Sequence, residues 1–143
     1  MNDGVGPASV PASNGLIHVA TALSVGAAFS RLEMVVARQN LKVFARIDFT
    51  ADAEAAGLKM QEAKLLVFGN PKAGTAVMVA SPTAAIDLPL KVLIWRDARG
   101  DVWLTFNDPE FLSERHGIPP HLARNIAGIA RLVAVSAEME AAA

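Results

Sequence analysis

The chain has 143 residues and a formal net charge of −1; 52% of the residues are hydrophobic and 19% are charged. This length suits one domain that buries its own core, and the scattered Lys and Arg side chains exclude an extended basic surface for nucleic acid. There is no cysteine, which excludes disulfides, thiolate catalysis and cysteine-ligated metal sites.

Two further features of the sequence bear on location and assembly. Residues 1–14 lack the basic and long apolar segments of a signal peptide, and no stretch reaches the ~18 apolar residues of a membrane span. We therefore predict a cytoplasmic protein without membrane contact. Because the apolar fraction is high for a small domain, we also predict a buried interface between two copies, as in a homodimer.

The N-terminal half alternates between strand and helix patterns. Residues 1–14 are rich in Gly, Pro, Ala and Ser without periodicity, which predicts a flexible arm, and residues 15–143 predict one domain. Ser24 is a good N-cap for the first helix, and Thr50 is the expected N-cap of a shorter helix that closes at Gly57. The predicted elements are a strand at 15–21, a helix at 25–40, a strand at 42–49 and a short helix at 51–56.

The C-terminal half predicts a hairpin between helices. Pro89 must end any helix before it, and Gly100 supplies the positive φ that a tight turn between two strands needs. The interior of the last helix is charged only at Arg124, Arg131 and Glu138, so we expect one long helix that is covered on more than one side. The predicted elements are a strand at 63–69, a helix at 71–80, strands at 91–97 and 101–108, a short helix at 109–117 and a final helix at 121–140.

The order of these elements does not follow the strict alternation of a doubly wound sheet, and the hairpin demands antiparallel pairing. We predict an α+β fold, a two-layer sandwich in which helices pack on one face of a mostly antiparallel sheet. Trp95 and Trp103 lie on the two hairpin strands and are expected to share one face, as core or interface.

The stretch FGNPKAGT, residues 68–75, has two glycines at the spacing of a phosphate-binding loop. Thr75 stands where that loop needs lysine, and Asn70 followed by Pro71 predicts a helix start that places the second glycine inside the helix. The stretch therefore does not indicate a nucleoside triphosphate site, because it lacks the lysine and the glycine placement that such a site needs. Two interpretations remain: a simple helix cap, or free N–H groups that hold a small anion or carboxylate together with Lys72.

Four short motifs stand out in the second half of the chain. They are Gly69-Asn70-Pro71, Leu88-Pro89, Asn107-Asp108-Pro109 after a tryptophan-containing strand, and Arg115-His116-Gly117. Together they resemble the domain-of-unknown-function 302 family of bacterial and archaeal proteins, over residues 15–135. Phe106 departs from the family pattern, which has tyrosine before Asn-Asp-Pro. The resemblance implies a small α+β domain, commonly dimeric, with no settled biochemical activity.

Two of these motifs carry titratable side chains with competing interpretations. Asp108 before Pro109 is typical of a helix cap, and the alternative is a carboxylate at the rim of a pocket. His116 is typical of a helix C-terminus, where it meets the carbonyl dipole. The alternative is a metal shared with His121, for which no third ligand is evident. We predict no metal site and no cofactor.

The leading functional hypothesis is a dimeric, non-enzymatic domain that binds a small anionic ligand or a partner protein, because no complete catalytic set is present. The predicted site lies where the helix start at Asn70, the turn at 87–91 and the loop at 107–108 would converge. The predicted ligand-binding residues are Asn70, Lys72, Asp87, Lys91, Asn107, Asp108 and His116.

Two alternatives come from other classes of function. In an enzyme on an anionic or carbonyl substrate, Lys72 or Lys91 would act as electrophile or Schiff-base lysine, with His116 or Asp108 as the acid/base residue. Such an enzyme should hold a buried lysine with a lowered pKa in a concave pocket. A purely structural interaction module should instead present a flat, self-complementary apolar patch.

Overall fold

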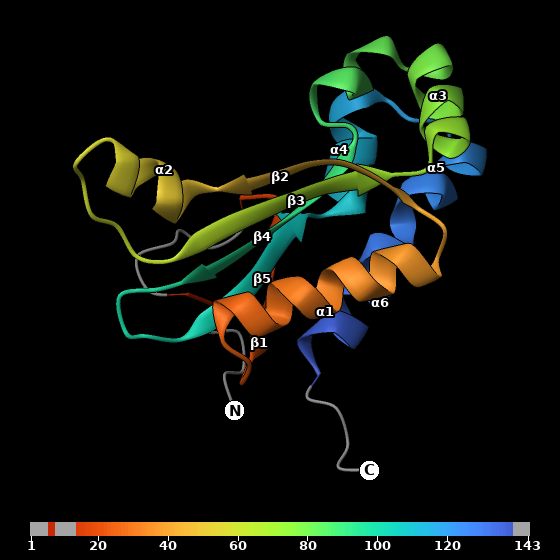
Figure 1. Cartoon of the computed structure of the whole chain (residues 1–143). Coiled ribbons are helices and arrows are strands. Elements are labelled where there is room, and N and C mark those ends of the chain that lie inside the picture. The colour runs from red at the N-terminus through yellow and green to blue at the C-terminus, as the bar shows by residue number, and fades with distance from the viewer. Residues whose placement is uncertain (1–5, 8–13, 139–143) are drawn as a thin grey trace.

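The computed structural model describes residues 6–7 and 14–138, which form one sheet with helices around it (Figure 1). The predicted arm, residues 1–14, lies outside the described residues apart from positions 6, 7 and 14. The elements in chain order are β1 Leu16–Thr21, α1 Val25–Arg38, β2 Lys42–Asp48, α2 Phe49–Ala55, β3 Ala63–Gly69, α3 Pro71–Ala80, the 3₁₀ helix η1 Pro82–Ile86, β4 Leu90–Arg96, β5 Val102–Asn107, α4 Pro109–His116, α5 Pro120–Ala127 and α6 Ile129–Ala137.

The strands form one sheet in the order β1-β5-β4-β3-β2, and every neighbouring pair is antiparallel. This arrangement confirms the predicted α+β fold. Trp95 pairs directly with Trp103 in the predicted hairpin, so the two side chains lie on the same face, as expected. A register shift between Val43 and Ala45 marks a bulge in edge strand β2, and the residue inside this bulge is Phe44.

Helices α1 and α6 pack on one face of the sheet and enclose the main core (Figure 1). Leu66 and Phe68 of β3 and Ile94 of β4 point toward these helices and are fully buried. They meet Leu32 of α1 and Val133 of α6, which are fully buried as well. Burying one such side chain contributes about 1.5–3 kcal/mol relative to leaving it exposed, so this face supplies much of the stability.

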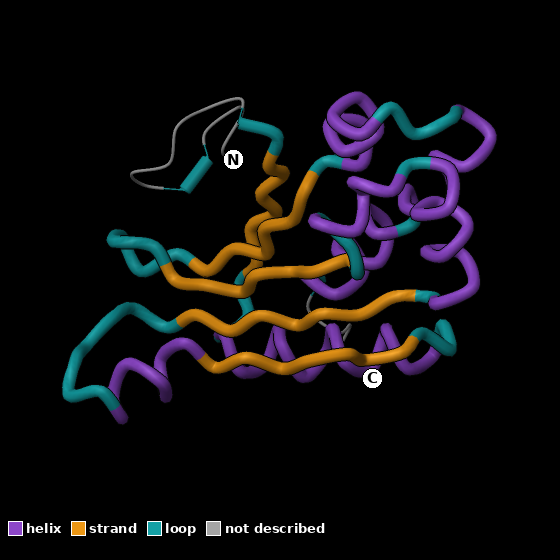
Figure 2. The backbone as a smooth tube through the Cα atoms, turned by 90° about the horizontal axis from the view of Figure 1, so that it is seen from above, coloured by secondary structure: helices purple, strands orange, loops and turns teal. Residues whose placement is uncertain are grey.

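The opposite face of the sheet is not crossed by any helix of the described residues (Figure 2). Strand residues there alternate with those of the main core, and Leu65, Val67 and Leu93 are half-buried. Trp103 is only 4% exposed on this face. The sheet therefore has one face sealed by helices and one apolar face that they leave open.

A second, smaller core lies at one end of the sheet. Helices α3, η1, α4 and α5 gather there (Figures 1 and 2). The buried side chains at its centre are Val77, Ala84, Leu112, Ile118 and Ile126. Leu90, at the start of β4, packs against both cores. The candidate site lies where the sheet meets this helical end.

The prediction of one final helix over 121–140 is wrong for the described residues, because the segment forms two helices that separate at Gly128. Glycine has a weak helix preference, and the break lets α5 pack against α3 and α4 while α6 packs against α1 and β1. The two helices thus bury their apolar sides in different cores. Positions 139 and 140 of the predicted helix lie outside the described residues.

The predicted N-cap at Thr50 is also wrong. Helix α2 begins at Phe49, and the carboxylate of Asp48 caps it by accepting a hydrogen bond from the Ala51 N–H at 3.0 Å. Asp is a stronger N-cap than Thr, and the Thr50 hydroxyl instead accepts from the Ala63 N–H at 2.9 Å. In the described part of the chain, no helix combines the length and hydrophobicity needed to cross a membrane.

Candidate functional site

A cavity of about 220 Å³ opens between the β3–α3 junction, the turn before β4, and α5. Most of its wall is apolar, and the main contributors are Phe44, Met78, Leu88, Pro89, Leu90 and Ile126. Three polar side chains also line it: Asn70, Thr75 and Asn125. An apolar wall with a few polar groups is the usual make-up of a small-molecule pocket. We refer to this cavity as the apolar pocket.

The β3–α3 junction forms one wall because Asn70 and Pro71 start the helix at the edge of the cavity. Asn70 Oδ1 accepts hydrogen bonds from the N–H groups of Lys72 at 3.0 Å and Ala73 at 3.3 Å, which confirms Asn70 as the predicted N-cap. These two donors are therefore occupied by the cap. Gly74 lies inside α3 and lines the pocket, as expected for a helix rather than a phosphate loop.

The second wall is the turn at 87–90, which contains a cis peptide bond between Leu88 and Pro89. This wall packs close to β3, since a Cβ built at Gly69 would lie in van der Waals contact with Pro89, 3.7 Å from its Cβ. The third wall is α5, which is tied to α3 because Asn125 Nδ2 donates to the carbonyl oxygen of Ala73 at 3.2 Å.

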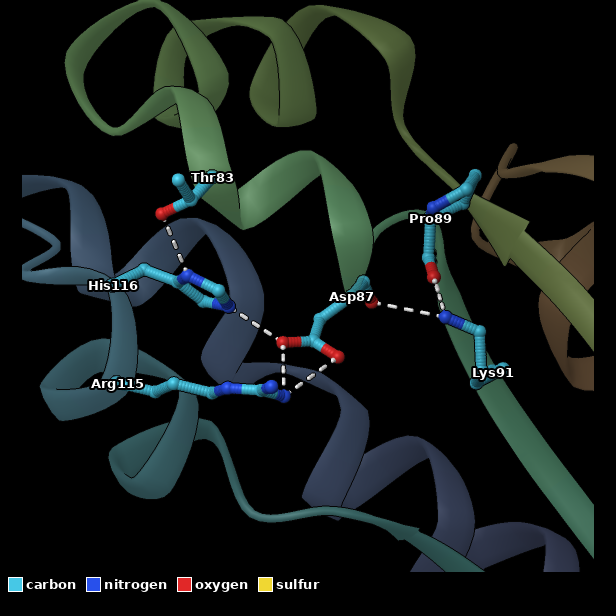
Figure 3. A network of polar contacts seen from close by, with 6 residues as sticks. All are labelled: Thr83, Asp87, Pro89, Lys91, Arg115 and His116. Atoms are coloured by element: carbon cyan, nitrogen blue, oxygen red, sulfur yellow. Dashed lines mark hydrogen bonds and ion pairs between the residues drawn. The ribbon is translucent and has the colours of Figure 1, made fainter.

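Next to the turn, the carboxylate of Asp87 joins the end of η1 to the end of α4 (Figure 3). Its Oδ2 lies 2.5 Å from His116 Nε2 and 3.1 Å from Arg115 Nη1. The other ring nitrogen of His116, Nδ1, lies 2.9 Å from Thr83 Oγ1. An ionised carboxylate only accepts hydrogen bonds, so Nε2 of His116 is a donor. We refer to Thr83, Asp87, Arg115 and His116 as the Asp87 cluster.

The Asp87 cluster places a hydroxyl, an imidazole and a carboxylate in sequence, which is the order found in nucleophilic hydrolases. However, Thr83 does not line the apolar pocket, and Arg115 shares the carboxylate. The cluster fastens η1 to the C-terminal end of α4, where His116 is the last helical residue, as predicted. Both ring nitrogens of His116 already have hydrogen-bonding partners, so neither is free to bind a metal ion together with His121.

Lys91 follows the turn and is held by backbone oxygens. Its ammonium donates to the carbonyl oxygens of Asp87 and Pro89, both at 3.0 Å (Figure 3). Burial lowers the pKa of Lys91 from its usual 10.5, and the nearby charge of Asp87 opposes that shift. Because two carbonyl groups engage the ammonium, the clearest effect of Lys91 is to fix the backbone of the pocket wall.

The structure brings together two of the three segments that the sequence analysis expected to converge. Asn70 and the turn at 87–91 meet at the apolar pocket, with Asp87, Lys91 and His116 behind the turn rather than among the lining residues.

The loop at 107–108 does not line the pocket. Asp108 instead caps α4, its Oδ1 accepting from the Glu110 N–H at 3.0 Å, and Asn107 pairs with Leu16 at the end of β5. Lys72 is exposed on α3.

Several lining residues were not predicted from the sequence. Phe44 reaches the pocket because the β2 bulge interrupts the alternation of the strand. Asn125 and Ile126 belong to a segment that was assigned to one continuous helix, and Met78 follows the helical pattern of α3 without any distinguishing feature. The polar Asn125 within an apolar stretch was the only signal available for this wall.

A separate polar group lies on the helix-free face of the sheet. The buried hydroxyl of Thr105 accepts a hydrogen bond from Trp95 Nε1 at 2.8 Å and lies 2.8 Å from His18 Nδ1. The ring of His18 also meets Trp103 edge-on, with 6.4 Å between centroids. Burial lowers the pKa of His18 from its usual 6.5, which favours the neutral imidazole that accepts the Thr105 hydroxyl hydrogen.

Comparison with known proteins identifies similar folds and sequences. A sequence model of the family described as "Domain of unknown function DUF302" matches residues 17–136. The crystal structure of an uncharacterized conserved DUF302 protein from Bacillus stearothermophilus resembles this chain with a TM-score of 0.72 and 18% sequence identity, covering 87% of this chain and 97% of that one. At this identity, the likeness shows a shared fold.

Sequence relatives include two proteins from Brucella. The chain is 39% identical over 105 residues to "Fluoride-specific ion channel FluC 1" of Brucella suis biovar 1 (strain 1330), a match that covers 73% of this chain and 41% of that protein. The protein of the same name from Brucella abortus biovar 1 (strain 9-941) matches with the same identity and 39% of its length. The chain thus spans about two fifths of the length of these relatives.

Proposed function

The chain belongs to the DUF302 family, and from this starting point we propose that it is a small-ligand-binding domain whose site is the apolar pocket. The observation that carries the proposal is a cavity of about 220 Å³ with a mostly apolar wall and three polar side chains. For comparison, an engineered apolar cavity of about 150 Å³ holds a benzene molecule. The pocket therefore has room for a ring or a short branched chain.

The positions of the ionisable groups favour binding over catalysis. The carboxylate of Asp87 is shared by Arg115 and His116, and the ammonium of Lys91 is engaged by two carbonyl groups. None of these side chains lines the pocket. A bound molecule would thus meet an apolar surface with amide and hydroxyl groups, which orient a ligand without supplying an acid, a base or a nucleophile.

The enzymatic alternative rests on the lowered pKa of Lys91. A Schiff-base lysine must present its amine to a carbonyl substrate. The test is reductive trapping: wild-type protein is incubated with pyruvate and sodium cyanoborohydride, and the site of any added mass is mapped. Modification at Lys91, absent from Lys91→Met, would support the enzyme. An unmodified Lys91 beside modified surface lysines would contradict it.

We further propose that the domain acts as a homodimer in the cytoplasm. The support for a dimer is the 52% hydrophobic composition together with the half-buried apolar side chains on the helix-free face of the sheet. Covering this face with a second copy of the chain would remove apolar surface from water and so stabilise a dimer. The cytoplasmic location stays a prediction made from the sequence.

The Brucella relatives suggest a second candidate role, because they are named as fluoride-specific ion channels and share 39% identity with this chain over 105 residues. By this likeness the domain would work alongside a fluoride channel and bind fluoride or a molecule that regulates transport. Calorimetric titration with sodium fluoride, with sodium chloride as the matched salt, tests direct binding. Heat specific to fluoride would support it, and identical heats would contradict direct binding.

The main proposal is tested by blocking the pocket without straining the fold. Gly74 lines the pocket within α3, and no atom lies within 4 Å of a Cβ added there. Gly74→Leu should therefore fill space beside the pocket and strengthen the helix, since glycine costs about 1 kcal/mol in a helix interior. Gly26→Leu is the matched control, because Gly26 lies in α1 with equally open surroundings.

The measurement is a thermal-shift screen with neutral compounds from benzyl alcohol to indole in size. A compound that binds only the folded state at 100 times its dissociation constant adds about 2.7 kcal/mol of stability. We expect at least one compound to raise the melting temperature of the wild type and Gly26→Leu but not that of Gly74→Leu. No response from the wild type, or an equal response from Gly74→Leu, would overturn the proposal.

A further inference from the structure

We propose that the ligand is a small amphipathic carboxylate, whose apolar part occupies the apolar pocket and whose carboxylate lies at Arg38 and Arg131; this rests on the proposed function. The observation behind it is a second cavity, an open groove of about 540 Å³ between α1 and α6. Asn70, Leu90 and Asn125 line both the groove and the apolar pocket. The two cavities are therefore neighbours that share these three residues in their walls.

The groove differs from the pocket in its charge. Arg38 from the last turn of α1 and Arg131 from the first turn of α6 line it, and none of the acidic side chains within the described residues does. An elongated molecule with one apolar end and one negative end would complement both cavities at once. A neutral ligand would leave the two positive charges unused, and a fully polar anion would gain nothing from the apolar pocket.

These two arginines also differ from three of the other arginines on the molecule. Arg46, Arg96 and Arg115 each lie within 4.0 Å of a carboxylate. In the described part of the chain, no such partner is found for Arg38, whose Nη2 contacts only Met34 Sδ at 3.4 Å, or for Arg131. Two cations without carboxylate partners beside an apolar pocket are available to an external anion.

The helix dipoles at the groove oppose one another. Gly128 and Ile129, at the start of α6, line the groove and favour negative charge, whereas the carbonyl end of α1 at Gln39 disfavours it. Because these contributions have opposite signs and similar size, the two arginines decide the preference for an anion. Their guanidinium groups also suit a carboxylate, since they present paired donors in one plane.

The test uses two probes of nearly equal shape, 3-phenylpropionate and its neutral amide 3-phenylpropanamide. The phenyl ring matches the size of the apolar pocket. Exposed ion pairs are individually weak but two of them act together here, so we expect the carboxylate to bind the wild type about ten-fold more tightly than the amide at low salt. The preference should shrink as salt is added, because exposed charges are screened.

The variants Arg38→Gln, Arg131→Gln and their combination should reduce the preference toward one-fold while amide binding stays unchanged. Arg99→Gln removes the same charge from the β4–β5 turn, at the other end of the sheet (Figure 1), and should leave the preference as in the wild type. Retained amide affinity shows that a variant is folded. This pattern, measured by isothermal titration calorimetry, would support the proposal.

Three results would overturn the inference. They are equal affinities for acid and amide in the wild type, a preference that survives in the double variant, or binding of neither probe. In each case the neutral-compound screen with Gly74→Leu still decides the proposed function independently. If the pocket binds neutral compounds but shows no preference for the carboxylate, the proposed binding function stands and only the assignment of a carboxylate ligand is overturned.

Discussion

At the scale of single residues, Asp87 organises the turn that forms one wall of the pocket. Its carboxylate is 16% exposed and lies beside the His116 side chain, which is 4% exposed. Its backbone oxygen accepts from Lys91 on the other side of the turn. One residue thus links η1, α4 and β4, although no motif in the sequence connects these segments.

Replacing Asp87 with Asn is expected to lower the free energy of unfolding by about 2 kcal/mol, because it removes charge-assisted hydrogen bonds to a nearly buried partner. Most of the loss should come from His116, since Arg115 is 53% exposed and its pairing is weakened by solvent. Urea denaturation would measure the effect. Glu54→Gln, on exposed α2, serves as the control, and equal stability of both variants would contradict the role of Asp87.

His18 should make stability depend on pH. Burial lowers the pKa of its imidazole in the folded state below the usual 6.5, so the unfolded chain binds more protons in the range below about 6.5. The free energy of unfolding should therefore fall as pH decreases through this range. His18→Gln should show a shallower fall when denaturation is repeated from pH 7 to about pH 5. Identical pH profiles would refute this assignment.

At the scale of elements, glycines at two helix ends have opposite conformations. Gly128, between α5 and α6, has φ −64° and ψ −15°, which any residue adopts. Gly117, after α4, has φ 61° and ψ 40°, the left-handed conformation that glycine tolerates best. The same substitution should therefore have opposite effects at the two positions.

Gly128→Ala should stabilise the protein by about 0.4–1 kcal/mol, because alanine restricts the unfolded chain, and no atom lies within 4 Å of the added Cβ. Gly117→Ala should destabilise it by about 1–2 kcal/mol, because the Cβ is strained at positive φ. Paired denaturation curves provide the measurement, and each variant controls for the other. Shifts of the same sign would contradict the conformational argument.

At the scale of the whole molecule, the helix-free face of the sheet is covered unevenly: Trp103 is only 4% exposed there, whereas other apolar side chains stay partly accessible. Leu65 of β3 and Leu93 of β4 pair directly on this face and are half-buried. An apolar face of this kind usually belongs to an interface in an assembled protein. The helices α3, η1, α4 and α5 gather at one end of the sheet rather than over this face (Figure 2).

We expect light scattering to give a mass near twice 15.0 kDa for the wild type. Leu93→Asp should shift the mass toward 15.0 kDa, because a buried, unpaired charge at an interface is costly. Circular dichroism would verify that the variant keeps its helices and strands, and Glu54→Gln again provides the control. A monomeric wild type at every concentration tested would contradict the dimer.

The local features of this protein were determined by its sequence. Asn70 with Pro71, and Asp108 with Pro109, each predicted a helix start that the structure confirms, and the turn before Gly100 predicted the hairpin. These signals work because caps and turns involve atoms only a few residues apart. The alternation of apolar residues likewise fixed the α+β class, since it decides which faces must be buried.

Only the tertiary structure decided where the chain breaks and what meets at the pocket. Gly128 separates α5 from α6 because the two halves bury their apolar sides in different cores, and a helical pattern alone contains no such information. Phe44 enters the pocket through a bulge, and Arg38 and Arg131 approach one groove from α1 and α6. These contacts depend on packing between segments that are distant in the chain, and the local periodicity of the sequence contains no information about such packing.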